Sequence, residues 1–234
     1  MSKKLKKIKA AQLNGNGVKS ENDSSLFTPI KPKTEGQALL LRAIEKSNIT
    51  ICDGPAGTGK TFISFASALR YLIADITINK IVIVRPTYTS GREPSIGYLP
   101  GTLDEKMGPF MAPILKDSAP LLIKHPDVES IVSKLDIEVV PLQFMRGRTF
   151  HNSFIILDEA QNCSMDDFRM FLTRIGRYSR VVIEGDASQA DRPDSALRRI
   201  MNELEGLNFV SNIYLNNDDV IRSPMVKKIL ERIG

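Results

Sequence analysis

Short apolar segments alternate with amphipathic segments along the chain from Pro29 onward. The apolar segments are rich in isoleucine and valine without interruption, as expected for strands covered on both faces of a sheet. The predicted strands are 49-ITICD-53, 80-KIVIVR-85, 137-IEVVP-141, 154-FIILD-158, 180-RVVIEGD-186 and 208-NFVSNIYL-215. The predicted helices span 61–73, 103–116, 127–135, 165–175, 195–204 and 224–233. This order predicts an α/β fold, with a mainly parallel sheet and helices on both of its faces.

Clear helix boundaries follow the fourth predicted strand. Ser164 and Asp167 have the spacing of a capping box, in which each side chain bonds the backbone N–H of the other residue. The helix that begins there has one apolar face, at Met165, Phe168, Leu172 and Ile175. Gly176 is expected to end it.

Length and composition indicate a globular protein of an aqueous compartment. The 234 residues are enough for one substantial α/β domain, and the 42% of hydrophobic and 25% of charged residues are ordinary proportions. The longest apolar stretch, 62-FISFASALRYLI-73, is interrupted by Arg70, so no membrane association is expected. Cys52 and Cys163 offer no disulfide framework, which favours a cytoplasmic location.

The excess of positive charge is confined to one end of the chain. The net charge is +5, and residues 3–9 carry five lysines without an acidic residue. Elsewhere basic and acidic residues balance. We therefore expect residues 1–28 to form a basic, disordered tail and residues 29–234 to form a single domain. Such a tail either holds phosphate backbones without sequence preference or only increases solubility, and the sequence leaves both open.

The strongest functional signal is 54-GPAGTGKT-61, a Walker A pattern between a predicted strand and a predicted helix. Its glycines allow backbone N–H groups to turn toward a phosphate, and the helix N-terminus adds positive potential. Lys60 is expected to reach the β- and γ-phosphates of ATP, and Thr61 to offer its hydroxyl to Mg²⁺. The predicted nucleotide-binding residues are Gly54, Pro55, Ala56, Gly57, Thr58, Gly59, Lys60 and Thr61.

Two adjacent carboxylates, Asp158 and Glu159, follow the apolar strand 153-SFIIL-157. A P-loop protein needs an acidic group at the end of a neighbouring strand to hold Mg²⁺, and Asp158 is expected to do so. Glu159 is then placed to act as general base toward the attacking water. The alternative is that both only favour a helix N-terminus. Because Ser164 already has the cap position, the catalytic interpretation is preferred.

A third motif, 184-EGDASQ-189, also stands at the end of an apolar strand. Gln189 can contact a γ-phosphate without adding charge, and so couple hydrolysis to a conformational change. Gly-Asp turns are common, so this motif gains weight only from the first two.

The motifs GPAGTGKT, ILDEAQ and GDASQ together resemble the first RecA-type core of superfamily 1 helicases. The resemblance is closer to the PhoH-like family of P-loop ATPases, and it covers about residues 29–234. Its segments are 85-RPTYTSGREPSIGYLPGTLDEKMGPFMAPI-114, 145-MRGRTFHNSFIILDEAQNCSMDDFRMFLTRIG-176, 185-GDASQADRP-193 and 219-DVIRSPMVKKIL-230. The resemblance implies a RecA-like fold, with the phosphate site at Gly54–Thr61, the Walker B pair at Asp158 and Glu159, and the sensor at Gln189.

The chain departs from the family pattern at a few positions. Glu184 ends the strand before Gly-Asp, the following segment is ASQADRP, and Ser223 replaces a histidine. These positions are expected to be peripheral to nucleotide hydrolysis. The short form with one core is similar to versions carried by bacteriophages.

Further candidates come from the helicase-like resemblance. Gln37 precedes the P-loop where relatives use a glutamine to contact adenine; the alternative is a solvent-facing residue at the start of a helix. A cation beyond Lys60 is also needed for the transition state. The candidate cations are Arg85, Arg146, Arg148 and Arg222, with Arg148 and Arg222 preferred as arginine fingers.

One core creates a requirement for a partner, because superfamily 1 motors cleave ATP between two RecA-like cores. A head-to-tail homo-oligomer satisfies it, and the resemblance implies a hexameric ring. The expected function is therefore a Mg²⁺-dependent ATPase coupled to RNA or single-stranded DNA. The alternative is an oligomeric ATP-dependent switch without unwinding. A P-loop kinase is disfavoured, since kinases generally lack the Asp-Glu pair.

Overall fold

The computed structural model describes residues 28–75, 77–86, 118–124, 126–221 and 232. Within these residues six strands form one parallel sheet, in the order β3-β2-β4-β5-β1-β6. The strands are β1 (Ile49–Asp53), β2 (Lys80–Arg85), β3 (Ile137–Pro141), β4 (Ser153–Leu157), β5 (Arg180–Gly185) and β6 (Val210–Tyr214). The predicted α/β fold is confirmed, and each strand agrees with its predicted range to within two residues.

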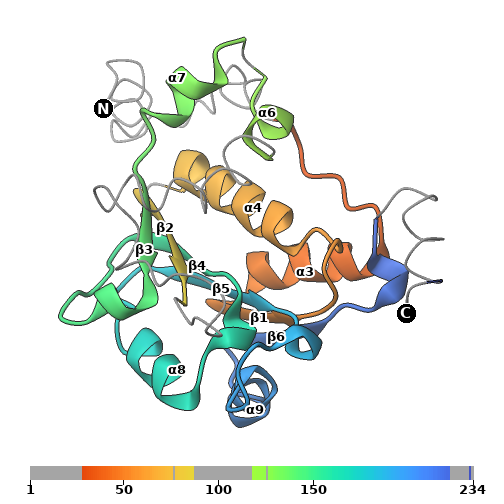
Figure 1. Ribbon diagram of the computed structural model, residues 1–234. Coiled ribbons are helices and arrows are strands. Elements are labelled where there is room, and N and C mark those ends of the chain that lie inside the picture. Colours follow the sequence, from red (N-terminus) through yellow and green to blue (C-terminus); the bar gives the residue numbers. More distant parts are fainter. Residues whose placement is uncertain (1–27, 76, 87–117, 125, 222–231, 233–234) are drawn as a thin grey trace.

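Helices cover both faces of the sheet (Figure 1). The α-helices are α3 (Glu35–Lys46), α4 (Lys60–Ala74), α6 (Ala119–Leu122), α7 (Val128–Val132), α8 (Met165–Leu172) and α9 (Leu197–Glu203). Four 3₁₀ turns complete the described elements: η3 (Leu142–Met145), η4 (Ala160–Asn162), η5 (Ala187–Gln189) and η6 (Asn217–Asp219). In Figure 1 α3 and α4 lie on one face, and α8 and α9 lie on the other.

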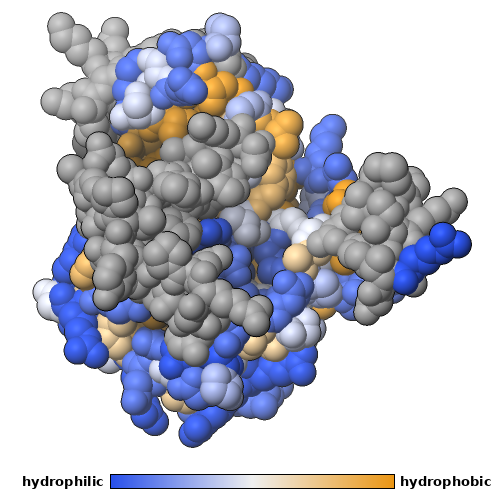
Figure 2. Space-filling view, viewed as in Figure 1, coloured by the Kyte–Doolittle hydropathy of each residue, from blue (hydrophilic) through white to orange (hydrophobic). Residues whose placement is uncertain are grey.

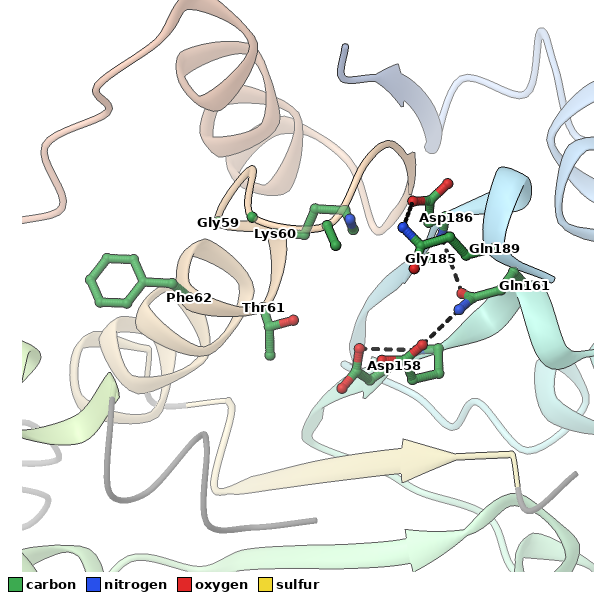
Figure 3. Close-up of a pocket in the computed structure, with 12 residues that line it drawn as sticks. Gly59, Lys60, Thr61, Phe62, Asp158, Gln161, Gly185, Asp186 and Gln189 are labelled. Atoms are coloured by element: carbon green, nitrogen blue, oxygen red, sulfur yellow. Dashed lines mark hydrogen bonds between the residues drawn. The ribbon is translucent and has the colours of Figure 1, made fainter. Parts of the chain in front are cut away.

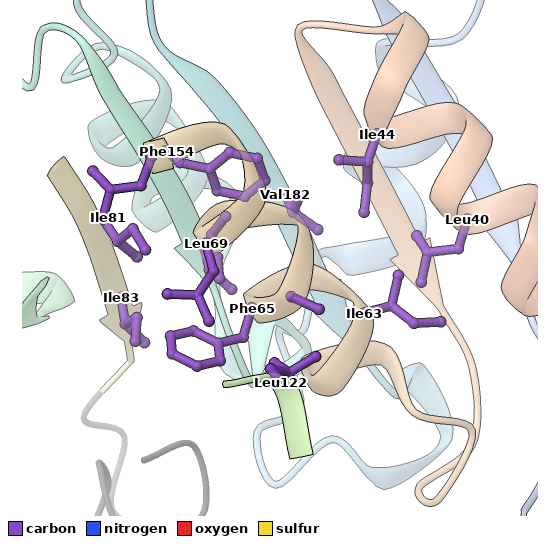
Figure 4. Close-up of a cluster of buried hydrophobic side chains, with 14 of the residues drawn as sticks. Leu40, Ile44, Ile63, Phe65, Leu69, Ile81, Ile83, Leu122, Phe154 and Val182 are labelled. Carbon is purple, nitrogen blue, oxygen red and sulfur yellow. The ribbon is translucent and has the colours of Figure 1, made fainter. Parts of the chain in front are cut away.

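Two apolar clusters hold these layers together. On the α4 side, Phe65 and Leu69 pack with Phe154 and Val182 of the sheet (Figure 4). On the opposite side, the cluster includes Ile155, Ile183, Phe168, Phe171 and Leu197. Each fully buried side chain of this size stabilises the fold by roughly 1.5–3 kcal/mol. Successive residues of β5 alternate between the clusters, so the sheet is buried on both faces, as the continuous apolar strands predicted.

The hydropathy of the molecular surface is consistent with helices that cover a buried sheet. Figure 2 shows a largely hydrophilic surface over α8 and α9, with apolar surface gathered at α6 and α7. Leu121 of α6 is 65% exposed. No helix in the described ranges is both long and apolar enough to cross a bilayer.

Helix α8 confirms the predicted start and corrects the predicted end. The Ser164 hydroxyl accepts from Asp167 N, and the Asp167 carboxylate accepts from Ser164 N, which completes the capping box. The helix ends at Leu172 instead of 175, because Ile175 leaves it to form a parallel bridge with Phe150. The Gly176 N–H then donates to the Phe150 carbonyl.

Other predicted segments differ in extent or lie outside the described residues. Helix α7 is shorter than the predicted 127–135 helix by one residue at its start and three at its end, and α9 is shorter than 195–204 by two residues at its start and one at its end. The predicted helix 103–116 and residues 1–27 of the predicted tail lie outside the described ranges, as does 224–233 apart from Arg232.

Candidate nucleotide and magnesium site

A pocket of about 280 Å³ lies at the carboxyl ends of β1, β4 and β5 (Figure 3). It is lined by Ala56, Gly57, Gly59, Lys60, Thr61, Phe62, Asp158, Glu159, Gln161, Gly185, Asp186 and Gln189. The three motifs found in the sequence therefore meet in one place. The sheet order explains this, since β5 lies between β1 and β4 and carries the Gly-Asp turn between the P-loop and the acidic pair. Ligands of parallel α/β sheets commonly bind at this edge.

The P-loop has a conformation that requires glycine at two positions. Gly57 and Gly59 have φ of 85° and 81°, in the left-handed region that other residues adopt only with strain. Gly59 is the N-cap of α4, so the free N–H groups of the first helical turn begin at the pocket. This arrangement suits an anion such as a phosphate group.

The predicted phosphate-binding residues divide into two groups. Ala56, Gly57, Gly59, Lys60 and Thr61 line the pocket, whereas Gly54, Pro55 and Thr58 do not. The latter shape the loop: the Thr58 hydroxyl donates to the Pro55 carbonyl at 2.9 Å.

Lys60 lies against the loop that precedes it. Its Nζ donates to the carbonyls of Gly54 and Pro55, at 2.6 and 2.9 Å. These bonds hold the ammonium group at the pocket wall.

Gln37 supports the P-loop from behind. Its Nε2 donates to the Thr58 carbonyl at 2.8 Å, and its Oε1 accepts from Lys33 N at 2.8 Å. The residue is 6% exposed, so the alternative of a solvent-facing glutamine is wrong. Gln37 is not among the pocket-lining residues, and adenine contact stays a prediction.

Asp158 is buried and firmly held. Its Oδ2 accepts from Arg85 Nε at 2.9 Å and from Arg85 Nη2, and its Oδ1 accepts from Glu159 N at 3.0 Å. Thr61 and Asp158 both line the pocket, and Figure 3 shows them on facing sides of it. A hydroxyl and a carboxylate are the hard oxygen donors that Mg²⁺ prefers, so these two residues fit the predicted metal site.

Glu159 is held in a conformation that is unusual for its residue type. Its φ of 57° is in the left-handed region. Its Oε2 accepts from Gln161 Nε2 at 2.6 Å, and Gln161 Oε1 accepts from Asp186 N at 3.1 Å. Strained backbone of this kind is often found at functional sites. Gln161, 4% exposed, therefore joins the predicted general base to the Gly-Asp turn.

Gln189 lines the pocket, as predicted for a γ-phosphate sensor. Its Nε2 donates to Asp186 Oδ2 at 2.8 Å, so its amide is oriented by the turn in which it lies. Gly185 in the same turn has no space for a side chain, because a Cβ there would lie 2.6 Å from Gln161 Oε1.

Two residues with a structural part in the site were missed from the sequence. Asp53, at the end of β1, accepts from Ala187 N at 2.8 Å and from Arg198 Nε at 3.1 Å, which ties the P-loop strand to the sensor turn. Gln161 was the other. The available signals were a carboxylate at the end of an apolar strand for Asp53 and the last position of the motif 156-ILDEAQ-161 for Gln161.

Glu184 was expected to be peripheral, and the structure corrects this. Its side chain is 0% exposed, and its Oε2 accepts from the Ser64 hydroxyl of α4 at 2.6 Å. Burial, with a smaller effect of the nearby Asp158 charge, raises the pKa of Glu184 to about 8; hydrogen bonding from Ser64 and Thr61 and the charge of Lys60 oppose this. The Glu184 carboxyl group thus contacts α4, the helix whose first residues line the pocket.

The predicted arginine fingers do not enter this pocket in the described part of the chain. Arg148 Nη2 lies 2.7 Å from Glu138 Oε1, and its guanidinium stacks 4.5 Å from the Phe150 ring centroid. Glu138 is paired in register with Val82, several residues before the strand ends that form the pocket. Arg222 lies outside the described residues. Both remain candidates for action on a neighbouring subunit.

Solved structures with a similar fold include the large terminase of a thermophilic bacteriophage. The large terminase of a thermophilic bacteriophage, in complex with ADP, superimposes with a TM-score of 0.54 at 11% identity, covering 86% of this chain and 50% of that one. Another crystal form of this terminase gives 0.52 at 15% identity, covering 87% of this chain and 51% of that one. At these identities the likeness shows a shared fold.

Curated relatives are more similar in sequence. A "PhoH-like protein" of Synechocystis sp. is 37% identical over 208 residues, which are 86% of this chain and 61% of that protein. The "PhoH-like protein" of Bacillus subtilis is 38% identical over 205 residues, 86% of this chain and 63% of that protein. "Protein PhoH" of Escherichia coli is 33% identical over 218 residues, 89% of this chain and 59% of that protein.

The chain thus spans about six-tenths of the length of each of these relatives. A family model described as PhoH-like protein matches residues 29–233, which include all three motifs and the pocket that they form. The chain belongs to the PhoH-like protein family.

Proposed function

We propose that this chain binds ATP together with Mg²⁺ and hydrolyses the bond to its γ-phosphate. The observation that carries the proposal is the pocket shared by Lys60, Thr61, Asp158 and Glu159. P-loop N–H groups and Lys60 would bind the phosphates, and Thr61 and Asp158 would hold Mg²⁺. When bound, Mg²⁺ neutralises charge on the β- and γ-phosphate oxygens.

Glu159 would accept a proton from the attacking water. The water oxygen forms a bond to the γ-phosphorus, the bond from that phosphorus to the β–γ bridging oxygen breaks, and ADP leaves. The contact with Gln161 holds the Glu159 carboxylate in place for this step. Gln189, on the turn joined to the same glutamine, lies in the pocket where it can contact the γ-phosphate.

The test is ATP turnover combined with nucleotide binding. Lys60→Ala is expected to lose both, and Glu159→Gln is expected to bind ATP while turnover falls about 10²–10⁴-fold. Glu205→Gln, at an exposed position of the α9–β6 connection, is the matched control. Turnover that survives Glu159→Gln at the wild-type rate would contradict the assigned base.

We further propose that turnover is coupled to RNA or single-stranded DNA. The supporting observation is Tyr178, which is 71% exposed and has a φ of 59°. It follows Arg177, and neither 142–153 nor 173–180 contains an acidic residue. Backbone bonds from Phe150 N to the Arg174 carbonyl and from Asn152 N to the Arg177 carbonyl join these segments. Exposed aromatic rings among arginines suit single-stranded nucleic acid.

Turnover is measured with and without single-stranded RNA and DNA over a range of salt concentrations. Coupling predicts stimulation that weakens steeply with salt and is reduced by Tyr178→Ala with Arg177→Gln. Tyr214→Ala, at a position 59% exposed on β6, is the control. An ATP turnover rate that does not change when RNA or DNA is added would favour the switch or assembly module instead.

An arginine from a neighbouring subunit, in a homo-oligomer such as a hexameric ring, would complete the site. In support, Arg148 is held by Glu138 away from the pocket of its own chain. Lys60→Ala subunits are mixed with Arg148→Ala or Arg222→Ala subunits, each inactive alone. Partial recovery supports a shared site, and no recovery at any ratio rejects it.

A further inference from the structure

Two consecutive carbonyl groups of the P-loop are held by donors from distant parts of the chain. The Gly57 carbonyl accepts from Ile221 N at 3.0 Å, and the Thr58 carbonyl accepts from Gln37 Nε2 at 2.8 Å. Neither donor residue is among those that line the nucleotide pocket. Both carbonyls are therefore held by groups that lie outside the pocket.

The direction of these carbonyls decides the direction of two amide groups. A trans peptide is planar, and its C=O and N–H bonds point in opposite directions. The plane of the Gly57 carbonyl carries the Thr58 N–H, and the plane of the Thr58 carbonyl carries the Gly59 N–H. Holding both carbonyls away from the pocket therefore turns both N–H groups toward it, where backbone donors suit a phosphate.

The Asp219 carboxylate fixes the first of the two donors, through the start of α3. Its Oδ1 accepts from the Thr34 hydroxyl at 2.5 Å and from Gly36 N at 3.1 Å. The Thr34 hydroxyl oxygen in turn accepts from Gln37 N at 3.2 Å, as the N-cap of the helix. A Cβ at Gly36 would overlap the Asp219 carboxylate, so the two residues fit closely. The helix turn that carries Gln37 is thus set by Asp219.

The same carboxylate fixes the second donor, through the turn η6. Its Oδ2 accepts from Asn216 N at 3.1 Å, which closes this turn two residues before Ile221. Asp219 is 6% exposed, so water competes little for these bonds. Segments that lie far apart in the sequence, the start of α3 and the chain after β6, are joined at this one residue (Figure 1).

We propose that Asp219 is a positioning residue for the phosphate-binding loop. Through the donors on α3 and after η6, it keeps the Thr58 and Gly59 N–H groups directed at the bound anion. This rests on the proposed function, since it assumes that the P-loop binds the phosphates of a nucleotide. Amide groups that are already oriented need no rearrangement when the anion enters, which increases affinity.

The experiment measures binding of a fluorescent ADP analogue to the full chain in EDTA, and its displacement by pyrophosphate. Asp219→Ala is expected to weaken both affinities by the same factor, about 10–100-fold, because the two amide groups are no longer held in place. Asp219→Asn keeps an oxygen that accepts from Thr34 and Gly36, and should restore most of the affinity. Asp218→Ala removes an exposed carboxylate from the same turn and is the matched control for charge.

Gly36→Ala tests the same contact without changing Asp219. The added methyl group displaces the carboxylate, so pyrophosphate binding should weaken in this variant too. Thermal unfolding without ligand shows which variants are folded, and Gly36→Ala decides the question if Asp219→Ala is not.

The outcomes separate the inference from the function on which it rests. A pyrophosphate affinity of the folded Asp219→Ala or Gly36→Ala variant equal to that of Asp218→Ala overturns the inference. An Asp219→Asn variant as impaired as Asp219→Ala also overturns it, because charge and not position would then matter. A wild-type chain that binds neither the analogue nor pyrophosphate contradicts the proposed function itself.

Discussion

The Arg85 guanidinium holds the Asp158 carboxylate, with Nε 2.9 Å from Oδ2. The Asp158 side chain is 6% exposed and the Arg85 side chain 19%, so water screens this ion pair only weakly. Because Arg85 ends β2 and Asp158 follows β4, the contact joins neighbouring strands at the pocket edge. A guanidinium therefore holds in place the carboxylate that is proposed to bind Mg²⁺.

Arg85→Met is expected to destabilise the metal-free protein by about 3 kcal/mol, because it leaves a buried carboxylate without its cation. Mg²⁺ with ADP should recover more stability in this variant than in wild type, since the ion replaces the missing positive charge. Chemical unfolding with and without Mg²⁺-ADP measures both effects. Arg70→Met is the control, because its ion pair with Glu45 is exposed and is worth about 0–1 kcal/mol. Equal losses in the two variants would show that Arg85 does not hold Asp158.

Gln161→Leu is expected to lower the ATP turnover rate about 10–100-fold while ATP binding stays near wild type. The amide is the link between Glu159 and the Asp186 backbone, so its loss frees the proposed base from its left-handed position. Steady-state kinetics and nucleotide titration separate the two quantities. Gln143→Leu, at an exposed position after β3, is the matched control. A variant with weakened binding and unchanged turnover would assign Gln161 to the nucleotide instead.

The sequence predicted the site residues that lie close together along the chain, but few of the side-chain contacts that join them across the sheet. Residues 54–61 and the pair Asp158 and Glu159 could be identified because each motif is contiguous and follows an apolar strand. The contacts of Asp53, Gln161 and Glu184 join separate strands and turns, and they depend on β5 lying between β1 and β4. Apolar periodicity gives strands but not their order, so Glu184 looked peripheral until the sheet placed it beneath the P-loop helix.

The raised pKa of Glu184 also predicts how the free energy of unfolding depends on pH in the absence of Mg²⁺. Its pKa rises from the ordinary 4.5 to about 8 in the folded protein, so between these values the folded state binds more protons than the unfolded state. This contribution to the free energy of unfolding is complete below about pH 4.5 and is lost as the pH rises through 8. The total loss is on the order of 5 kcal/mol.

Urea unfolding in EDTA at a series of pH values measures this effect. The side chain introduced by Glu184→Gln does not titrate, so the fall in the free energy of unfolding with rising pH should disappear. At high pH the variant should then be more stable than the wild type. Parallel pH profiles of the variant and wild type would show that the carboxyl group does not carry the effect.

Gln37→Ala distinguishes support of the P-loop from contact with adenine. The substitution leaves the buried Thr58 carbonyl without the Gln37 Nε2 donor, which is expected to cost about 1–3 kcal/mol of stability. Because the damage is to the loop that is proposed to bind phosphates, ATP and GTP should lose affinity by the same factor. Titration of both nucleotides measures this, with Gln143→Ala as the exposed control. A loss confined to ATP would instead show that the amide contacts adenine, since only base recognition distinguishes two nucleotides with identical phosphates.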